Sequence, residues 1–250
     1  MIERKYKLKR TKIVGTIGPS SISKKIIRKM ILAGLNVCRI NFSHSNHEEA
    51  LKIINTVREL NIELNSHVAV MGDLRGPKLR VGQVEKNVTL IKGEQICVIG
   101  GEGVSNNSNI FISYSNIAND VKIGEKILID DGKIILRVNT FDNDKVICDI
   151  IQGGGLFSNK GFNLPNTHIS IPTITRKDSE DVLFCVQNKI EWVALSFVRR
   201  GSDMISLKTL IHDLNGDCKI IAKIEKPEAI KNLNSIVKNS DALMVARGDL

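Results

Sequence analysis

The chain has 250 residues, of which 42% are hydrophobic and 25% are charged, so it can form a sizeable core and is not typical of a disordered protein. Its formal net charge of +9 would suit anionic metabolites or nucleic acid, but with only 4% aromatic residues there are few rings on which bases could stack. No apolar run approaches the roughly 20 residues of a membrane helix, and the basic N-terminus lacks the apolar segment of a secretory signal. The five cysteines are scattered without a CxxC pair, which argues against a disulfide framework or a zinc site and favours reduced thiols in the cytoplasm.

The first part of the chain alternates β-rich runs with helical patterns. TKIVGTIG, NVCRINF and HVAVMGDL predict strands, whereas ISKKIIRKMILAG and HEEALKIINTVREL predict amphipathic helices. Gly34 is expected to end the first of these helices. This rhythm is typical of right-handed parallel βαβ units.

From Arg75 to Thr167 the pattern changes to short β-rich runs without a long helical pattern. VTLIKGEQICVIG, NIFISY and EKILIDDGKIILRV are apolar or alternating segments broken by Gly, Asn and Asp, and ILIDDGKIIL predicts a hairpin around Asp131-Gly132. We therefore predict a separate all-β domain at 75–167, inserted between the two parts of another domain at 1–74 and 168–250.

The strand–helix alternation resumes after the segment IPTIT. DSEDVLFCVQN, SDMISLKTLIHDL and PEAIKNLNSIVKN predict helices, and WVALSFV, KIIAKIE and ALMVARGDL predict strands. The six strands favour an α/β fold of the TIM (β/α)8 type, incomplete in this chain because two further units are needed, with an inserted all-β lid domain. We interpret the chain as the N-terminal portion of a longer protein or as a truncated relative. An open doubly wound sheet is the rival interpretation, but no G-x-G-x-x-G follows any strand.

Polar residues gather at the C-terminal end of the second predicted strand, where α/β folds build their sites. Because side chains alternate along a strand, Arg39, Asn41 and Ser43 share one face. The alternative is structural, with Arg39 in an ion pair and the other two capping the next helix. The residues from His47 to Glu49 are interpreted as the solvated first turn of that helix.

The same alternation pairs Lys223 with Glu225, and Arg247 with Asp249. A structural salt bridge and a turn residue are the alternatives for these two groups. Two carboxylates that end successive strands can hold a divalent cation through few protein oxygens and leave room for phosphate, as Mg²⁺ prefers.

Positive charge for a phosphate group would come from Arg39, Arg75, Arg80 and Lys223. Phosphoryl transfer depends mainly on positioning and on charge neutralisation, so such a set of cations with one metal is sufficient for it.

Eight motifs, in order, give the chain a family resemblance. TKIVGTIGPSS, NVCRINFSH, GDLRGPKLR, LIDDGKI, NKGFNLPN, SFVRRGSD, KIEKPEAI and MVARGDL together resemble pyruvate kinase over nearly all 250 residues. The resemblance implies a (β/α)8 barrel with a lid inserted after the third strand and a C-terminal regulatory domain beyond this chain. It also implies magnesium-dependent transfer of phosphate from phosphoenolpyruvate to ADP, giving pyruvate and ATP in the last step of glycolysis, by a cytoplasmic homotetramer.

The resemblance also assigns roles to residues that match the family's motifs. Arg39 would bind the phosphate of phosphoenolpyruvate, and Lys223 would stabilise charge on the phosphoryl group and the enolate. Glu225 and Asp249 would hold Mg²⁺, with Mn²⁺ as a possible substitute, and the backbone at Gly248 would help to hold the substrate. The expected nucleotide contacts are Asn41, Phe42, Ser43, His44, Arg80 and Lys160.

The stretch MGDLRGPKLRVG departs from the pattern of most family members. They carry Thr after the Asp and Glu after Gly-Pro, beside a bound potassium ion, whereas this chain has Leu74 and Lys78. Asn41, Ser43 and Asp73 still match the potassium ligands. Because two close cations repel each other, we expect the Lys78 ammonium group to replace potassium, so that K⁺ is not required. The alternative is that Lys78 faces solvent and potassium binds.

Two hypotheses of other classes remain. The first is a truncated, catalytically inactive relative that only binds a ligand or a partner, since the family's threonine beyond the sixth strand lies outside this chain. The second is a nucleic-acid-binding protein, which only the net charge supports.

Overall fold

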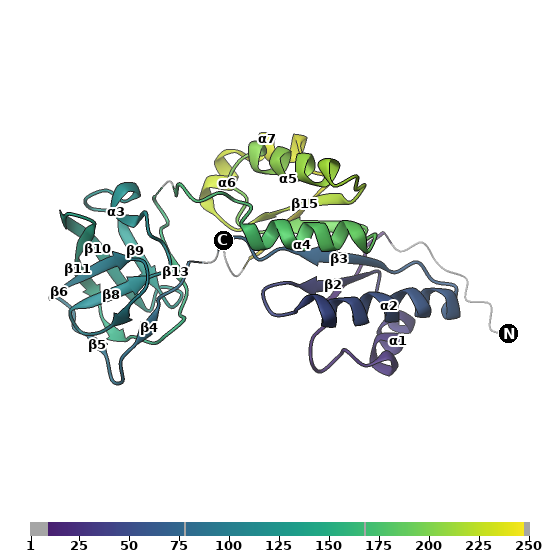
Figure 1. Cartoon of the computed structure of the whole chain (residues 1–250), viewed down its shortest axis with the longest axis horizontal. Helices are drawn as coiled ribbons and strands as arrows, with labels where there is room; N and C mark the ends of the chain where they lie inside the picture. The colour runs from purple at the N-terminus through teal and green to yellow at the C-terminus, as the bar shows by residue number, and fades with distance from the viewer. Residues whose placement is uncertain (1–9, 78, 168, 248–250) are drawn as a thin grey trace. The chain divides into compact units, whose positions relative to one another are not determined.

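The computed structural model describes residues 10–77, 79–167 and 169–247 (Figure 1). No helix within these ranges is both long enough and apolar enough to cross a membrane.

The chain divides into two compact units. Unit 1 consists of Met1–Pro77 and Thr173–Leu250, and unit 2 consists of Lys78–Pro172. The sequence prediction placed the inserted domain at 75–167.

Unit 1 is built around a parallel sheet of six strands in the order β1-β2-β3-β14-β15-β16. All six strands predicted for the barrel are present, and β3 pairs directly with β14 although unit 2 separates them in the sequence. The fold is therefore an α/β fold of the (β/α)8-barrel type, incomplete in this chain, with an inserted β domain. The strands are β1 (Val14–Thr16), β2 (Val37–Asn41), β3 (Ala69–Asp73), β14 (Trp192–Leu195), β15 (Lys219–Ile224) and β16 (Ala242–Val245).

Helices alternate with these strands, and their ends follow the local sequence. Ser23 caps α1 through its side chain, and Gly34 ends this helix at φ 110°, as predicted. Asn46 caps α2 by accepting from the Glu49 N–H. The helices of unit 1 are α1 (Lys24–Ala33), α2 (His47–Leu64), α4 (Arg176–Gln187), α5 (Gly201–Asp213), α6 (Pro227–Lys231) and α7 (Leu233–Lys238).

The single helix predicted for PEAIKNLNSIVKN is divided into α6 and α7 at Asn232. The side-chain amide of Asn232 donates to the backbone oxygens of Arg199 (3.0 Å) and Glu228 (3.2 Å), and so ties this turn to the segment before α5. A tertiary contact therefore overrides the helical pattern here.

The two faces of the parallel sheet are packed differently. On the outer face, residues such as Val70 join the helices in the main core of unit 1. On the inner face, Met71, Ala194 and Ile221 form a small apolar cluster of their own. Because side chains alternate, residues two positions beyond this inner cluster share its face at the C-terminal ends of the strands.

Unit 2 has its own apolar core and a six-stranded sheet in the order β13-β9-β10-β11-β6-β8. The predicted hairpin joins β9 and β10, and Asp130, Asp131 and Gly132 take positive φ in its turn. Unit 2 also contains a short helix, α3 (Ile117–Asp120), within the predicted all-β region. This helix was not predicted, because four residues are too few to show a helical period. The strands are β4 (Gln83–Val84), β5 (Thr89–Leu90), β6 (Gln95–Gly100), β7 (Val104–Ser105), β8 (Asn109–Ile112), β9 (Lys126–Ile129), β10 (Ile134–Asp142), β11 (Lys145–Gln152), β12 (Gly154–Gly155) and β13 (Phe162–Asn163).

Candidate active site

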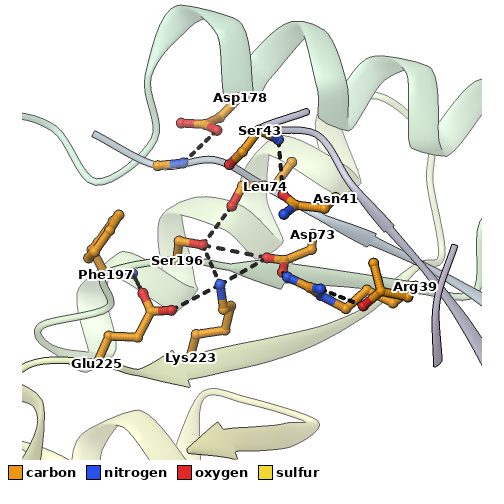
Figure 2. Close-up of polar contacts among 12 residues, drawn as sticks. Arg39, Asn41, Ser43, Asp73, Leu74, Asp178, Ser196, Phe197, Lys223 and Glu225 are labelled. Atoms are coloured by element: carbon orange, nitrogen blue, oxygen red, sulfur yellow. Dashed lines mark hydrogen bonds and ion pairs between the residues drawn. The ribbon is translucent and has the colours of Figure 1, made fainter. Parts of the chain in front are cut away.

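Charged side chains converge at the C-terminal ends of the central strands of unit 1 (Figure 2). Asp73, Ser196 and Lys223 each lie two residues beyond a member of the inner apolar cluster, and Glu225 lies two residues beyond Lys223. The exposed fractions are 1% for Asp73, 9% for Lys223 and 4% for Glu225. Buried charges need partners, so the contacts among these groups determine what the site can do.

The Lys223 ammonium group lies at the centre of this cluster. Its Nζ is 2.9 Å from Glu225 Oε1, 3.2 Å from Asp73 Oδ1 and 2.8 Å from Ser196 Oγ. An ammonium group has three protons, and the three oxygens are acceptors for them. Ser196 Oγ in turn donates to the backbone oxygen of Leu74 at 2.6 Å, which fixes the hydroxyl as an acceptor towards Lys223.

Arg39 joins the cluster through the second oxygen of Asp73. Its Nε donates to Asp73 Oδ2 at 2.7 Å, its Nη2 lies 2.5 Å from the same oxygen, and its Nη1 donates to Thr16 Oγ1 at 2.6 Å. The ion pair considered for Arg39 from the sequence is therefore present, and so is the salt bridge between Lys223 and Glu225. Asp73 thus bridges two cations that the sequence placed on separate strands.

Glu225 is held from both sides. Its Oε2 accepts from the Phe197 N–H at 2.7 Å, and Phe197 takes φ +56°, which is uncommon for a bulky residue. The neighbouring Lys226 lies over the Phe197 ring at 5.9 Å, and burial, followed by the charge of Arg199, lowers the pKa of Lys226 below its ordinary value. The carboxylate of Glu225 is therefore firmly placed as a possible ligand for a hard cation.

The Gly-Pro turn after β3 is anchored to α4. Gly76 takes φ +66° and donates its N–H to Asp178 Oδ1 at 3.0 Å. A Cβ at this position would lie 3.0 Å from the Phe197 ring. Asp178 also forms the capping box of α4 with Thr175. This turn therefore requires glycine and lies against the segment that positions Glu225.

Four of the residues expected to contact a nucleotide are Asn41, which ends β2, and the first three residues of the loop that follows it. Asn41 Oδ1 accepts from the Ser43 N–H, and the backbone oxygen of Asn41 accepts from the His44 N–H, both at 3.0 Å. Asn41 and Ser43 do not cap α2, since Asn46 has that role. The ring of Phe42 is buried in the core, with 3% exposed, whereas His44 is exposed.

The other two expected nucleotide contacts belong to unit 2. Arg80 Nη1 donates to the backbone oxygen of Asn159 at 2.6 Å, and Lys160 Nζ lies 3.0 Å from Asp130 Oδ1. The hydrogen bonds from Lys133 and then Lys160 hold the pKa of Asp130 below its ordinary value. Both basic side chains are thus held by contacts within unit 2.

Three expected site residues, Lys78, Gly248 and Asp249, lie outside the described residues. Within the described ranges there is no group of three or more His, Cys, Asp and Glu side chains that could hold a metal ion. Asp249, the second carboxylate expected to bind magnesium, is therefore not among the side chains whose contacts are described.

Four residues of the site were missed from the sequence: Thr16, Asp178, Ser196 and Phe197. Ser196 could have been found, since it lies within the predicted strand WVALSFV, two positions after Ala194 and therefore on the same face. Asp178 also has a signal, because Thr175 three residues before it completes a capping pattern. Phe197 could not have been found, because it contacts Glu225 through its backbone N–H and the side-chain pattern does not predict such contacts.

The sequence of residues 8–250 matches a family model described as "Pyruvate kinase, barrel domain". The chain belongs to the pyruvate kinase family. It is similar to the proteins named "Pyruvate kinase" from Staphylococcus aureus strains MRSA252, USA300 and NCTC 8325, with 40% identity over 246 residues and 97% of this chain covered. The family resemblance inferred from the eight motifs is confirmed, and the chain spans 42% of the length of these pyruvate kinases.

Proposed function

We propose that the whole protein is a pyruvate kinase that transfers phosphate from phosphoenolpyruvate to ADP and yields pyruvate and ATP. The observation that carries this proposal is the buried Lys223 ammonium group between Asp73, Ser196 and Glu225, with Arg39 beside it. Two neighbouring cations, of which Lys223 is almost fully buried, can neutralise a phosphate and the negative charge that develops on an enolate.

Arg39 is the residue best suited to bind the phosphate of the substrate. Its guanidinium is fixed by Asp73 and Thr16, and its side chain is 22% exposed, so it can remain in place while it accepts an anion. Lys223 is proposed to stabilise charge on the phosphoryl group and the enolate oxygen. The backbone at Gly248, outside the described residues, is proposed to help hold the substrate.

Of the two residues expected to bind Mg²⁺, the one that the structure describes, Glu225, fits this ion. Glu225 supplies carboxylate oxygens, which are the ligands Mg²⁺ takes, and its orientation is fixed by Lys223 and the Phe197 N–H. Glu225 and Asp249 would hold the ion, and Mn²⁺ could replace it. Bound there, the metal would neutralise charge on oxygens of the substrate.

Unit 2 is proposed to be the lid, and its Arg80 and Lys160 to contact the phosphates of the nucleotide. The loop from Asn41 to His44 is proposed to meet the nucleotide from unit 1. Assembly as a homotetramer, expected from the resemblance, remains a prediction.

We also propose that the protein does not require potassium. Both carboxylate oxygens of Asp73 contact cations of this chain, and the backbone oxygen of Leu74 accepts from Ser196. These three oxygens of Asp73 and Leu74 are therefore already engaged, which leaves less room for a potassium ion; we propose that Lys78 supplies the charge in its place.

The test is pyruvate formation by the whole protein from phosphoenolpyruvate and ADP, in buffer free of potassium and other monovalent activators. We expect full turnover there, and we expect Lys78→Glu to abolish it or to make it depend on added potassium. Lys86→Glu, which makes the same charge change at an exposed position of unit 2, is the matched control and should have no such effect. Strong potassium activation of the unmutated protein would show that Lys78 does not replace the ion.

The same assay on the 250-residue chain addresses the alternative, that this stretch binds ligand without turnover. Pyruvate formation by the pure chain would reject that alternative.

A further inference from the structure

A second cluster of charged and aromatic side chains lies outside the Lys223 site. It joins the first residue of α2, His47, to Asp181 of α4, whose Oδ1 is 2.6 Å from His47 Nε2. Since an ionised carboxylate only accepts hydrogen bonds, Nε2 is the donor. Asp181 is 0% exposed, while the side chain of His47 is 41% exposed. His47 lies in the first turn of α2 with a partly exposed side chain, as the sequence indicated, but its contact with Asp181 was not foreseen; Glu48 next to it is exposed.

Aromatic contacts complete the cluster. The His47 ring stacks on Phe184 of α4 with 4.4 Å between centroids and 12° between planes. Phe42 meets both rings edge-on at 5.9 Å. Lys177 forms an ion pair with Asp181, and its Nζ lies 5.8 Å from the centre of the Phe42 ring. We call Phe42, His47, Lys177, Asp181 and Phe184 the His47 cluster.

The buried carboxylate of Asp181 is not explained by a contribution to stability. Its Oδ1 accepts from both His47 and Lys177, but among the described residues its buried Oδ2 has no hydrogen-bond partner. A buried carboxylate with an unsatisfied oxygen is often less stabilising than an apolar residue of the same size. A role in fixing geometry accounts for such a group better than a role in stability does.

The geometry that the cluster fixes is that of the loop between β2 and α2. Phe42 is the first residue of this loop and His47 directly follows it, and both are packed against α4. Between them, the N–H groups of His44 and Ser45 both donate to the Asn41 oxygen at 3.0 Å, which closes a tight turn. The loop is therefore held at both ends, while His44 at its tip is exposed.

We propose that His47 and Asp181 are positioning residues for the nucleotide. They hold the loop against α4 so that Ser43 and His44 are presented in one geometry to a nucleoside diphosphate. This inference rests on the proposed function, because it assumes that this loop meets ADP. His47 and Asp181 would thus act on the nucleotide through the loop, without touching the substrate themselves.

The test compares KM values of variants of the whole protein. We expect His47→Leu, which retains bulk but removes the donor, and Asp181→Asn to raise the KM for ADP about ten-fold, while the KM for phosphoenolpyruvate stays within about two-fold. His47→Gln retains an N–H donor and should restore most of the affinity for ADP. Because both residues act through one contact, the double variant should be no worse than Asp181→Asn alone.

Glu48→Ala is the matched control, since it removes the exposed pair with Lys52 from the same turn of α2 and should leave both KM values unchanged. Unchanged KM for ADP in His47→Leu, or equal rises for both substrates, would overturn the inference and leave the proposed function standing. No turnover by the unmutated protein would instead reject the proposed function, and the inference with it. If Asp181→Asn does not fold, the comparison of His47→Leu with His47→Gln decides the question.

Discussion

The ion pairs around Lys223 in unit 1 and those around Asp130 in unit 2 differ in their exposure to solvent. In unit 1, the carboxylates of Asp73 and Glu225 are 1% and 4% exposed and share a buried ammonium group. In unit 2, the side chain of Asp130 is 15% exposed, and its partners Lys133 and Lys160 are 72% and 39% exposed. Both clusters pair carboxylates with basic side chains, but the cluster in unit 1 is buried, whereas the basic side chains in unit 2 are exposed to solvent.

The difference follows from the two kinds of sheet. A parallel sheet with helices on one face and side chains filling the other shields groups at the ends of its central strands. A hairpin turn of an antiparallel sheet lies at the surface, where water and salt screen its charges. The buried ion pairs of Lys223 should therefore contribute strongly to stability, whereas the more exposed pairs of Asp130 should contribute little.

The largest effect is expected from Lys223→Met. It leaves Asp73 facing only Arg39, and leaves Glu225 buried without its cation, so we expect a loss of about 3–5 kcal/mol in the free energy of unfolding. Turnover of the whole protein should fall about 100- to 1,000-fold or more, since charge stabilisation at the reacting group is removed. Urea denaturation and the pyruvate assay measure the two effects.

Lys133→Met in unit 2 is the matched control for this change. It removes a lysine from an equally short ion pair, 2.9 Å from its carboxylate in both cases, but an exposed one. Equal losses of stability in the two variants would show that burial does not set the difference between the units.

A smaller effect is expected from Gly76→Ala. Both Gly76 (φ +66°) and Gly132 (φ +84°) occupy the left-handed region, but a Cβ at Gly76 would lie 3.0 Å from the Phe197 ring, while Gly132 has open space around it. Gly132→Ala should therefore cost about 1–2 kcal/mol from backbone strain alone. Gly76→Ala should cost more and should also reduce turnover, because Phe197 orients Glu225. Denaturant melts that rank Gly132→Ala as the worse variant would contradict this.

The smallest effect is expected from Asp130→Asn. Hydrogen bonds from Lys133 and Lys160 hold the pKa of Asp130 below its ordinary value, so its ion pairs stabilise the folded state above the unfolded pKa of 3.8 and are lost as pH falls through the folded value. Asp130→Asn should therefore reduce stability slightly at neutral pH, and the difference should shrink in acid. An NMR titration of the Asp130 carboxyl carbon in the unmutated protein checks the pKa directly, and a midpoint above 3.8 would be the wrong sign.

The sequence predicted those features that depend on local pattern. The six strands and the shared face of Lys223 and Glu225 follow from the residue pattern, and the end of α1 follows from the left-handed conformation that Gly34 adopts easily. The division of the helix at Asn232 could not be predicted, because its partner lies on another segment.

Contacts between distant segments also explain what was missed at the site. Asp73 was assigned only to a potassium site, yet it bridges Arg39 and Lys223, which are 184 positions apart in the numbered chain. His47 was taken as solvated because its partner Asp181 is on α4, far along the sequence. Single-sequence patterns show which face a residue occupies, but not which neighbour it meets.

The central claim is that Glu225, buried beside Lys223, is a metal ligand of a phosphoryl-transfer site. Binding of Mn²⁺ to the whole protein in the presence of phosphoenolpyruvate, followed by electron paramagnetic resonance, tests it most directly. We expect Glu225→Gln to lose the bound Mn²⁺ signal, and Glu228→Gln, three residues later on α6, to retain it. Mn²⁺ binding by Glu225→Gln that matched the unmutated protein would show that Glu225 is not a metal ligand.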